Sequence, residues 1–174
     1  MKKNYVKNSV LAAMFIAIGI VLPFFTGQVP RIGNMLLPMH LPVFICSFIC
    51  GWKYSLFVGG LLPLLRSFIF GMPMLYPTAI AMSVELAVYG LVTGLVYGLT
   101  KKNTVALYIS MLTAMISGRV AWGIAQVILL GLTDGAFTWQ MFIAGAFLNA
   151  IPGIILQLII VPVIVTRLKS AELA

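Results

Sequence analysis

The sequence predicts an all-α polytopic membrane protein, a bundle of six transmembrane helices with the N-terminus and C-terminus in the cytoplasm. Of the 174 residues, 62% are hydrophobic and only 8% are charged, which is typical of membrane helices. The net charge of +8 comes from basic residues at the ends of apolar runs rather than from one basic stripe, which favours contact with lipid headgroups over nucleic-acid binding. We expect residues 1–174 to form one domain in the lipid bilayer.

The first three expected spans are apolar runs that end at turn-forming residues. The first, about 9–25, precedes a loop at 27–34 that is rich in Gly and Pro. We expect it to be a retained helix, because no small-residue cleavage site follows it. The second, about 37–50, is short for a bilayer core about 30 Å thick and depends on its neighbours. The third, about 54–70, ends at Gly71 and Pro73.

The last three expected spans are longer. The fourth, about 77–99, ends at a basic turn, 101–103, and the fifth follows at 104–130. A turn at 131–135, with two glycines and an aspartate, closes the fifth span, and the sixth covers about 138–168 as one helix. Each of these runs has at least the roughly 20 residues that a helix needs to cross a bilayer.

The basic residues fix the orientation of six spans. With that count, one side of the membrane carries Lys2, Lys3, Lys7, Lys53, Lys101, Lys102, Arg167 and Lys169. Only Arg31 and Asp134 fall in loops on the other side. The positive-inside rule therefore puts both termini in the cytoplasm, whereas an odd count would scatter the lysines over both faces.

Isolated ionisable residues inside the spans are the main candidate ligands. Arg66, Glu85 and Arg119 interrupt apolar runs, and His40 lies near the start of the second span. An ionisable side chain in a membrane helix is costly and is usually found on a pathway or at a ligand site. Two arginines against one glutamate leave a net positive interior, which favours a small anionic solute.

Further candidate binding residues are neutral and polar or aromatic: Trp122, Gln126, Asn149, Asn34 and Tyr76. On the predicted topology, Trp122 and Gln126 follow Arg119 toward the outer face, and Asn149 reaches the middle of the membrane. These depths predict a pocket that opens outward and is closed below.

Each candidate also has a purely structural alternative. Arg66 could extend its charge to the outer headgroups, and Arg119 could form a structural salt bridge with Glu85. Hydrogen bonding between helices would account for Gln126 and Asn149, and local hydrogen bonding for His40. Tyr76 lies at the depth of an interfacial aromatic belt. Trp122 is deeper, which favours a stacking role.

Several kinds of chemistry have no sequence signature in this chain. There is no phosphate-binding G-x-x-x-x-G-K-[ST], no H-E-x-x-H, no G-x-S-x-G and no aspartate pair, so we expect no enzyme activity and no cofactor. Cys46 and Cys50 lie one helical turn apart without further ligands nearby, so no metal site is expected. Without a nucleotide motif or an internal repeat of the transporter kind, a binding subunit would need partners.

Four sequence features together resemble one family over essentially the whole chain. They are the six short spans with Ala13 and Ala17 in the first, and the runs LPMHLP (37–42), GMPMLYP (71–77) and GRVAWG (118–123). They resemble the substrate-binding S components of energy-coupling factor (ECF) vitamin transporters, most closely the pantothenate-type members. The resemblance implies a six-helix S-component domain in the cell membrane of a prokaryote, with an outward-opening pocket.

The resemblance also implies partners. S components dock on a transmembrane coupling subunit and two cytoplasmic ATPases, which hydrolyse ATP, and are thought to topple in the membrane to deliver the vitamin. The small residues of the first helix are the family's docking surface, which corresponds here to Ala13 and Ala17.

Pantothenate, a carboxylate with hydroxyls and an amide, agrees with the positive interior, because arginine can hold a carboxylate through two hydrogen bonds. Folate, cobalamin and a hydroxymethylpyrimidine precursor remain open as substrates. A stand-alone small-solute carrier and a membrane enzyme or structural subunit remain the alternatives from other classes.

Overall fold

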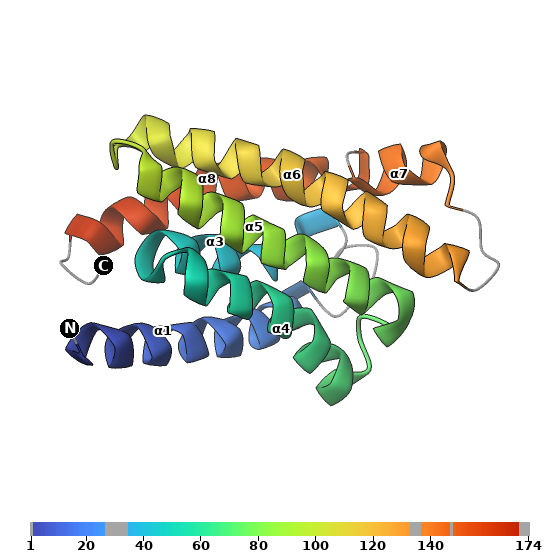
Figure 1. Cartoon of the computed structure of the whole chain (residues 1–174), viewed down its shortest axis with the longest axis horizontal. Helices are drawn as coiled ribbons and strands as arrows, with labels where there is room; N and C mark the ends of the chain where they lie inside the picture. The colour runs from blue at the N-terminus through green and yellow to red at the C-terminus, as the bar shows by residue number, and fades with distance from the viewer. Residues whose placement is uncertain (1, 27–34, 133–136, 147, 171–174) are drawn as a thin grey trace.

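The computed structural model describes residues 2–26, 35–132, 137–146 and 148–170, and every regular element in these ranges is helical (Figure 1). The elements are α1 (Lys2–Val21), η1 (Leu22–Thr26), α3 (His40–Cys50), α4 (Trp52–Phe70), η2 (Leu75–Ala79), α5 (Ile80–Leu99), α6 (Thr104–Gly131), α7 (Trp139–Ala146), η3 (Leu148–Ala150) and α8 (Ile151–Ser170). The predicted all-α class is confirmed for the described residues.

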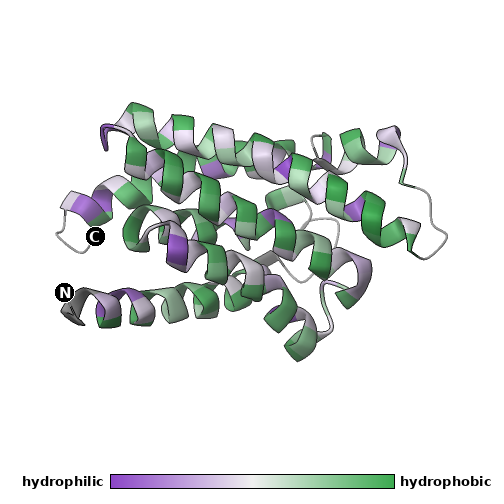
Figure 2. Ribbon diagram, viewed as in Figure 1, coloured by the Kyte–Doolittle hydropathy of each residue, from purple (hydrophilic) through white to green (hydrophobic). Residues whose placement is uncertain are grey.

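Five stretches are long and apolar enough to cross a membrane: Tyr5–Phe25, Trp52–Phe70, Leu75–Leu99, Thr104–Gly131 and Trp139–Ser170. The protein is therefore a multi-pass membrane protein. α3 is apolar but has only 11 residues, so the count of six spans stays a prediction. Both termini and the α5–α6 connection lie at one end of the bundle (Figure 1), and hydrophilic residues gather there (Figure 2). The assignment of that end to the cytoplasm also remains a prediction.

The sixth expected span differs from the structure, because α7 and α8 replace one continuous helix. A helix running through this region would place Pro152 in its interior, where proline lacks the N–H that bonds the preceding turn and its ring clashes with that turn. Pro152 is instead the second residue of α8, a position in the first turn where no such N–H is needed. The short η3 directly precedes it.

α5 is the central helix of the bundle and packs along α4 and α6 and against α3. Small residues allow this close approach. A Cβ on Gly90 would lie 2.4 Å from the Ser55 carbonyl oxygen, so only glycine fits there. The Gly90 carbonyl accepts hydrogen bonds from Ser55 Oγ at 2.8 Å and Ser47 Oγ at 3.3 Å, which joins α3, α4 and α5 at one point. This packing places α5 directly against α3, which carries His40, and α4, which carries Arg66.

Candidate functional site

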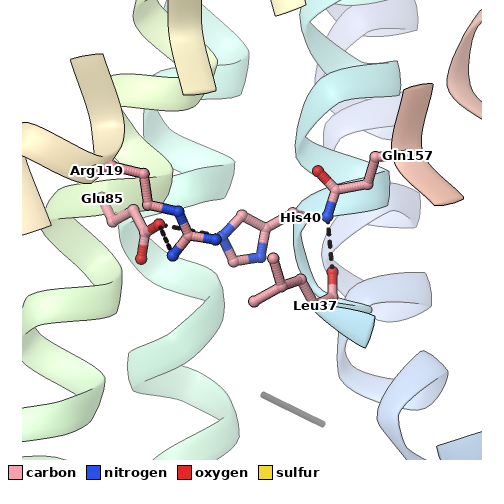
Figure 3. A network of polar contacts seen from close by, with 5 residues as sticks. All are labelled: Leu37, His40, Glu85, Arg119 and Gln157. Atoms are coloured by element: carbon pink, nitrogen blue, oxygen red, sulfur yellow. Dashed lines mark hydrogen bonds and ion pairs between the residues drawn. The ribbon is translucent and has the colours of Figure 1, made fainter. Parts of the chain in front are cut away.

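Three ionisable side chains meet in the interior of the bundle. Glu85 comes from α5, Arg119 from α6, and His40 is the first residue of α3 (Figure 3). Arg119 Nη1 lies 2.8 Å from Glu85 Oε1, and His40 Nε2 lies 3.5 Å from the same oxygen. All three side chains are almost fully buried, with exposures of 5% or less. We call these three residues the buried ionic cluster.

Tyr89 packs directly against the cluster. Its ring meets the His40 ring edge to face, with 5.0 Å between the centroids. Gly118, the residue before Arg119, faces the same ring, and a Cβ there would lie 2.2 Å from it. Because glycine lets α6 come this close, the Arg119 side chain reaches Glu85 across the α5–α6 contact. The GRVAWG run thus combines a small packing residue with the charged one.

The cluster retains hydrogen-bonding capacity that the described residues do not fill. Arg119 Nε and Nη2 are buried without a hydrogen-bond partner among them, as is His40 Nδ1. Buried polar atoms are satisfied in the great majority of cases, so several unsatisfied atoms in one place need an explanation. A bound polar ligand is one such explanation.

The comparison with protein families identifies the class of protein. Residues 7–165 match the family described as ECF transporter, substrate-specific component. The chain belongs to this family. It is therefore a vitamin- or substrate-binding subunit of a transporter, and its family implies a membrane-embedded ECF module with ATPases as partner. No curated protein and no solved structure matches the chain.

Gln157 of this S component lies near the cluster and was missed by the sequence analysis. Its side chain is fully buried on α8, and Nε2 donates to the Leu37 carbonyl at 3.5 Å, on the His40 side of the cluster (Figure 3). Its Oε1 has no hydrogen-bond partner among the described residues. One turn earlier, a Cβ on Gly153 would lie 2.5 Å from the Met35 carbonyl oxygen. In the sequence, the feature that could have indicated Gln157 is its polar amide side chain within an otherwise apolar run.

Two more predicted residues lie on α6 near Arg119. Gln126, two helical turns after Arg119, is buried, and its Oε1 has no partner among the described residues. Trp122 is half-buried and packs against the rings of Phe137 at 5.6 Å and Phe142 at 6.3 Å, close to α7. The structure thus gives Trp122 aromatic neighbours, and its stacking on a substrate stays a prediction.

The remaining predicted binding residues do not join the cluster. Arg66 Nη1 donates to the carbonyl of Ile20, and the Tyr76 hydroxyl donates to the carbonyl of Leu129. Asn149 is exposed on η3, and Asn34 lies outside the described residues. Ala13 and Ala17, the predicted docking residues, are exposed on α1.

A separate groove of about 470 Å³ lies between α6 and α7, lined by Val120, Gly123, Ile124, Val127, Ile128, Phe137, Thr138, Trp139 and Phe142. Its lining is mostly apolar, with the Thr138 hydroxyl and the Trp139 indole N–H as its polar side-chain groups, and it contains no cation that could pair with a carboxylate. The buried ionic cluster is therefore the better candidate for the vitamin site.

Proposed function

We propose that this chain is the high-affinity pantothenate-binding S component of an ECF importer, one transmembrane domain in the cell membrane of a prokaryote. The vitamin binds at the buried ionic cluster from the outside. It is delivered inward when the subunit docks on a transmembrane coupling subunit driven by two cytoplasmic ATPases.

The observation that carries the proposal is the unused edge of the Arg119 guanidinium. Nη1 is held by Glu85 at 2.8 Å, while Nε and Nη2 have no hydrogen-bond partner among the described residues. These two nitrogens form one edge of the planar fork, and their N–H groups are parallel. That edge matches the two oxygens of a carboxylate in a bidentate pair, which is among the stronger hydrogen-bonded interactions in proteins. Glu85 fixes the orientation of the guanidinium through its ion pair with Nη1.

The unsatisfied amide oxygens support a ligand that also donates hydrogen bonds. Gln126 Oε1 and Gln157 Oε1 are acceptors without partners among the described residues. A hydroxyl or an amide N–H would satisfy them, and leaving such groups unpaired in the bound state would cost affinity. Pantothenate carries a carboxylate, two hydroxyls and an amide, so its groups complement both the guanidinium edge and the amides.

Docking is proposed to use the exposed face of α1 that carries Ala13 and Ala17. Both are small and lie one turn apart, which lets a partner helix approach closely. In a membrane, helix association depends on such packing because lipid is as apolar as the helix surface. A face of this kind on a peripheral helix is suited to a partner in the coupling module.

The direct test is a titration of the purified protein in detergent, without ATP or partner subunits, followed by calorimetry and tryptophan fluorescence. Pantothenate is expected to bind saturably, and pantothenol, in which an alcohol replaces the carboxylate, is expected to bind at least about tenfold more weakly, from the loss of one charge-assisted pair worth about 1.5–3 kcal/mol. Folate, cobalamin and hydroxymethylpyrimidine complete the panel. Tight binding of one of these instead would reassign the vitamin, and no binding by any would contradict the binding-subunit proposal.

A further inference from the structure

α1 is held to the bundle along one side only. It packs against α3 and α4, while much of its remaining surface is exposed, including Tyr5, Val10, Met14 and Val21 at 51–61%. The predicted docking face belongs to this helix. The position of that face relative to the vitamin site therefore depends on whatever fixes α1 to its neighbours.

Two side chains of α4 bind the α1 backbone, one near each end. The Tyr54 hydroxyl donates to the Tyr5 carbonyl at 3.5 Å, and Arg66 Nη1 donates to the Ile20 carbonyl at 2.6 Å. The start of α4 thus meets the start of α1, and the end of α4 meets its end, so the two helices run parallel. The Arg66 bond is the shorter of the two, and its donor is a charged guanidinium.

The Ile20 carbonyl, which accepts the Arg66 hydrogen bond, lies where a cation is favoured. Ile20 is the last residue but one of α1, where α-helical hydrogen bonding gives way to the 3-10 turns of η1, and orphan carbonyls at such a transition are commonly met by side chains. The same end carries the negative pole of the helix dipole, so a guanidinium there is favoured. One residue earlier, a Cβ on Gly19 would lie 2.4 Å from the Leu62 side chain, which shows how closely α1 and α4 approach beside this bond.

Two aromatic rings enclose the guanidinium. Its central carbon lies 5.3 Å from the centre of the Phe24 ring, in η1, and 5.7 Å from the Phe70 ring, at the end of α4. The two rings meet edge to face at 4.9 Å, and Arg66 is 3% exposed. Cation–π contacts of this kind are strongest where water is excluded. Arg66 therefore joins α4 to both α1 and the segment that follows it.

We propose that Arg66 is a positioning residue: it fastens the C-terminal end of α1 to α4 and thereby keeps the docking face in register with the bundle, without touching the vitamin. The inference rests on the docking role proposed for α1. It predicts that loss of Arg66 separates uptake from binding, since the buried ionic cluster lies on α3, α5 and α6 and its ion pairs do not involve Arg66.

The test measures the α1–α4 distance directly, in the absence of any vitamin. Spin labels are placed at the exposed positions Ile18 and Leu61 of the full chain, with Cys46 and Cys50 replaced by alanine, and the distance distribution is recorded by pulsed electron paramagnetic resonance. Arg66→Gln is expected to broaden and lengthen the distribution. The matched control is Arg167→Gln, which removes an exposed cation from the last turn of α8 and should leave the distribution unchanged.

Two milder variants test whether a change in distance reflects the loss of this contact rather than misfolding of the Arg66→Gln protein. Arg66→Lys can still donate to the Ile20 carbonyl but lacks the planar contact with the rings, so an intermediate distribution is expected. Phe24→Leu keeps the arginine and removes one ring, and should also broaden the distribution. A distribution that stays as narrow as in the unsubstituted protein in these variants overturns the proposal, whether or not pantothenate is the vitamin.

A functional readout separates positioning from general destabilisation. In cells that carry the coupling module, Arg66→Gln should lower vitamin uptake at least about tenfold, with partial rescue by Arg66→Lys, while the dissociation constant for pantothenate changes by less than about twofold. A large loss of affinity with α1 still in place would instead make Arg66 a vitamin ligand and would overturn the positioning role. If pantothenate does not bind the unsubstituted protein, the proposed substrate fails and the distance measurement still decides this inference.

Discussion

Replacing Arg119 with alanine is expected to weaken pantothenate binding at least about thirtyfold. Removing one member of a buried, hydrogen-bonded charge pair typically costs about 2–5 kcal/mol, and 1.4 kcal/mol corresponds to a factor of ten. Arg119→Lys should restore only part of the affinity, because an ammonium can pair with Glu85 but cannot offer the parallel Nε and Nη2 donors. Calorimetry on the purified variants measures the effect.

The competing explanation is that Arg119 only neutralises Glu85 and so stabilises the bundle. The 2.8 Å pair in the structure is compatible with either role. Melting temperatures recorded beside the affinities separate them, with Glu85→Gln as the matched variant that leaves the arginine in place. A folded Arg119→Ala protein with unchanged affinity would exclude the proposed anion site, whereas a loss of affinity beyond that of Glu85→Gln supports it.

Replacing Ala17 with tryptophan is expected to abolish vitamin uptake and to leave binding by the isolated subunit unchanged. The indole would hold a partner helix away from a face that works only if its residues are small. Uptake of labelled vitamin by cells that carry the coupling module is compared with the affinity of the purified variant. Ala13→Trp should behave in the same way.

The matched control for this change is Ile116→Trp, which adds a similar bulk to an exposed position on α6, across the bundle from α1 (Figure 1). It should transport normally. Normal uptake by the Ala17→Trp protein at normal expression would show that this face of α1 is not the docking surface.

Much of the fold followed from local signals in the sequence. The fifth span, expected at 104–130, is α6 at Thr104–Gly131, because the Asn103 side chain accepts a hydrogen bond from Ala106 N at 2.8 Å and caps the helix start. The break between α7 and α8 was missed, although Pro152 was visible, since hydropathy alone does not register a missing N–H. The start of α3 was placed three residues too early.

The candidate site was predictable only in part. Glu85 and Arg119 are oppositely charged residues in successive spans, so their meeting could be anticipated from the cost of burying either charge alone. The contact of Arg66 with a backbone carbonyl could not be anticipated. Every residue carries a backbone acceptor, and the sequence does not show which helix end will lie near Arg66. Gln157 was overlooked because nothing charged lies near it in the sequence.

The central claim is that a carboxylate vitamin, pantothenate, binds at Arg119, and the small molecule carried by the protein tests it most directly. The subunit would be purified in detergent from cells supplied with a mixture of vitamins, denatured, and the released compounds identified by mass spectrometry, with Arg119→Ala purified in parallel. We expect pantothenate from the unsubstituted protein, near one equivalent, and much less from the variant. A vitamin without a carboxylate, or equal amounts of pantothenate from both proteins, would contradict the account.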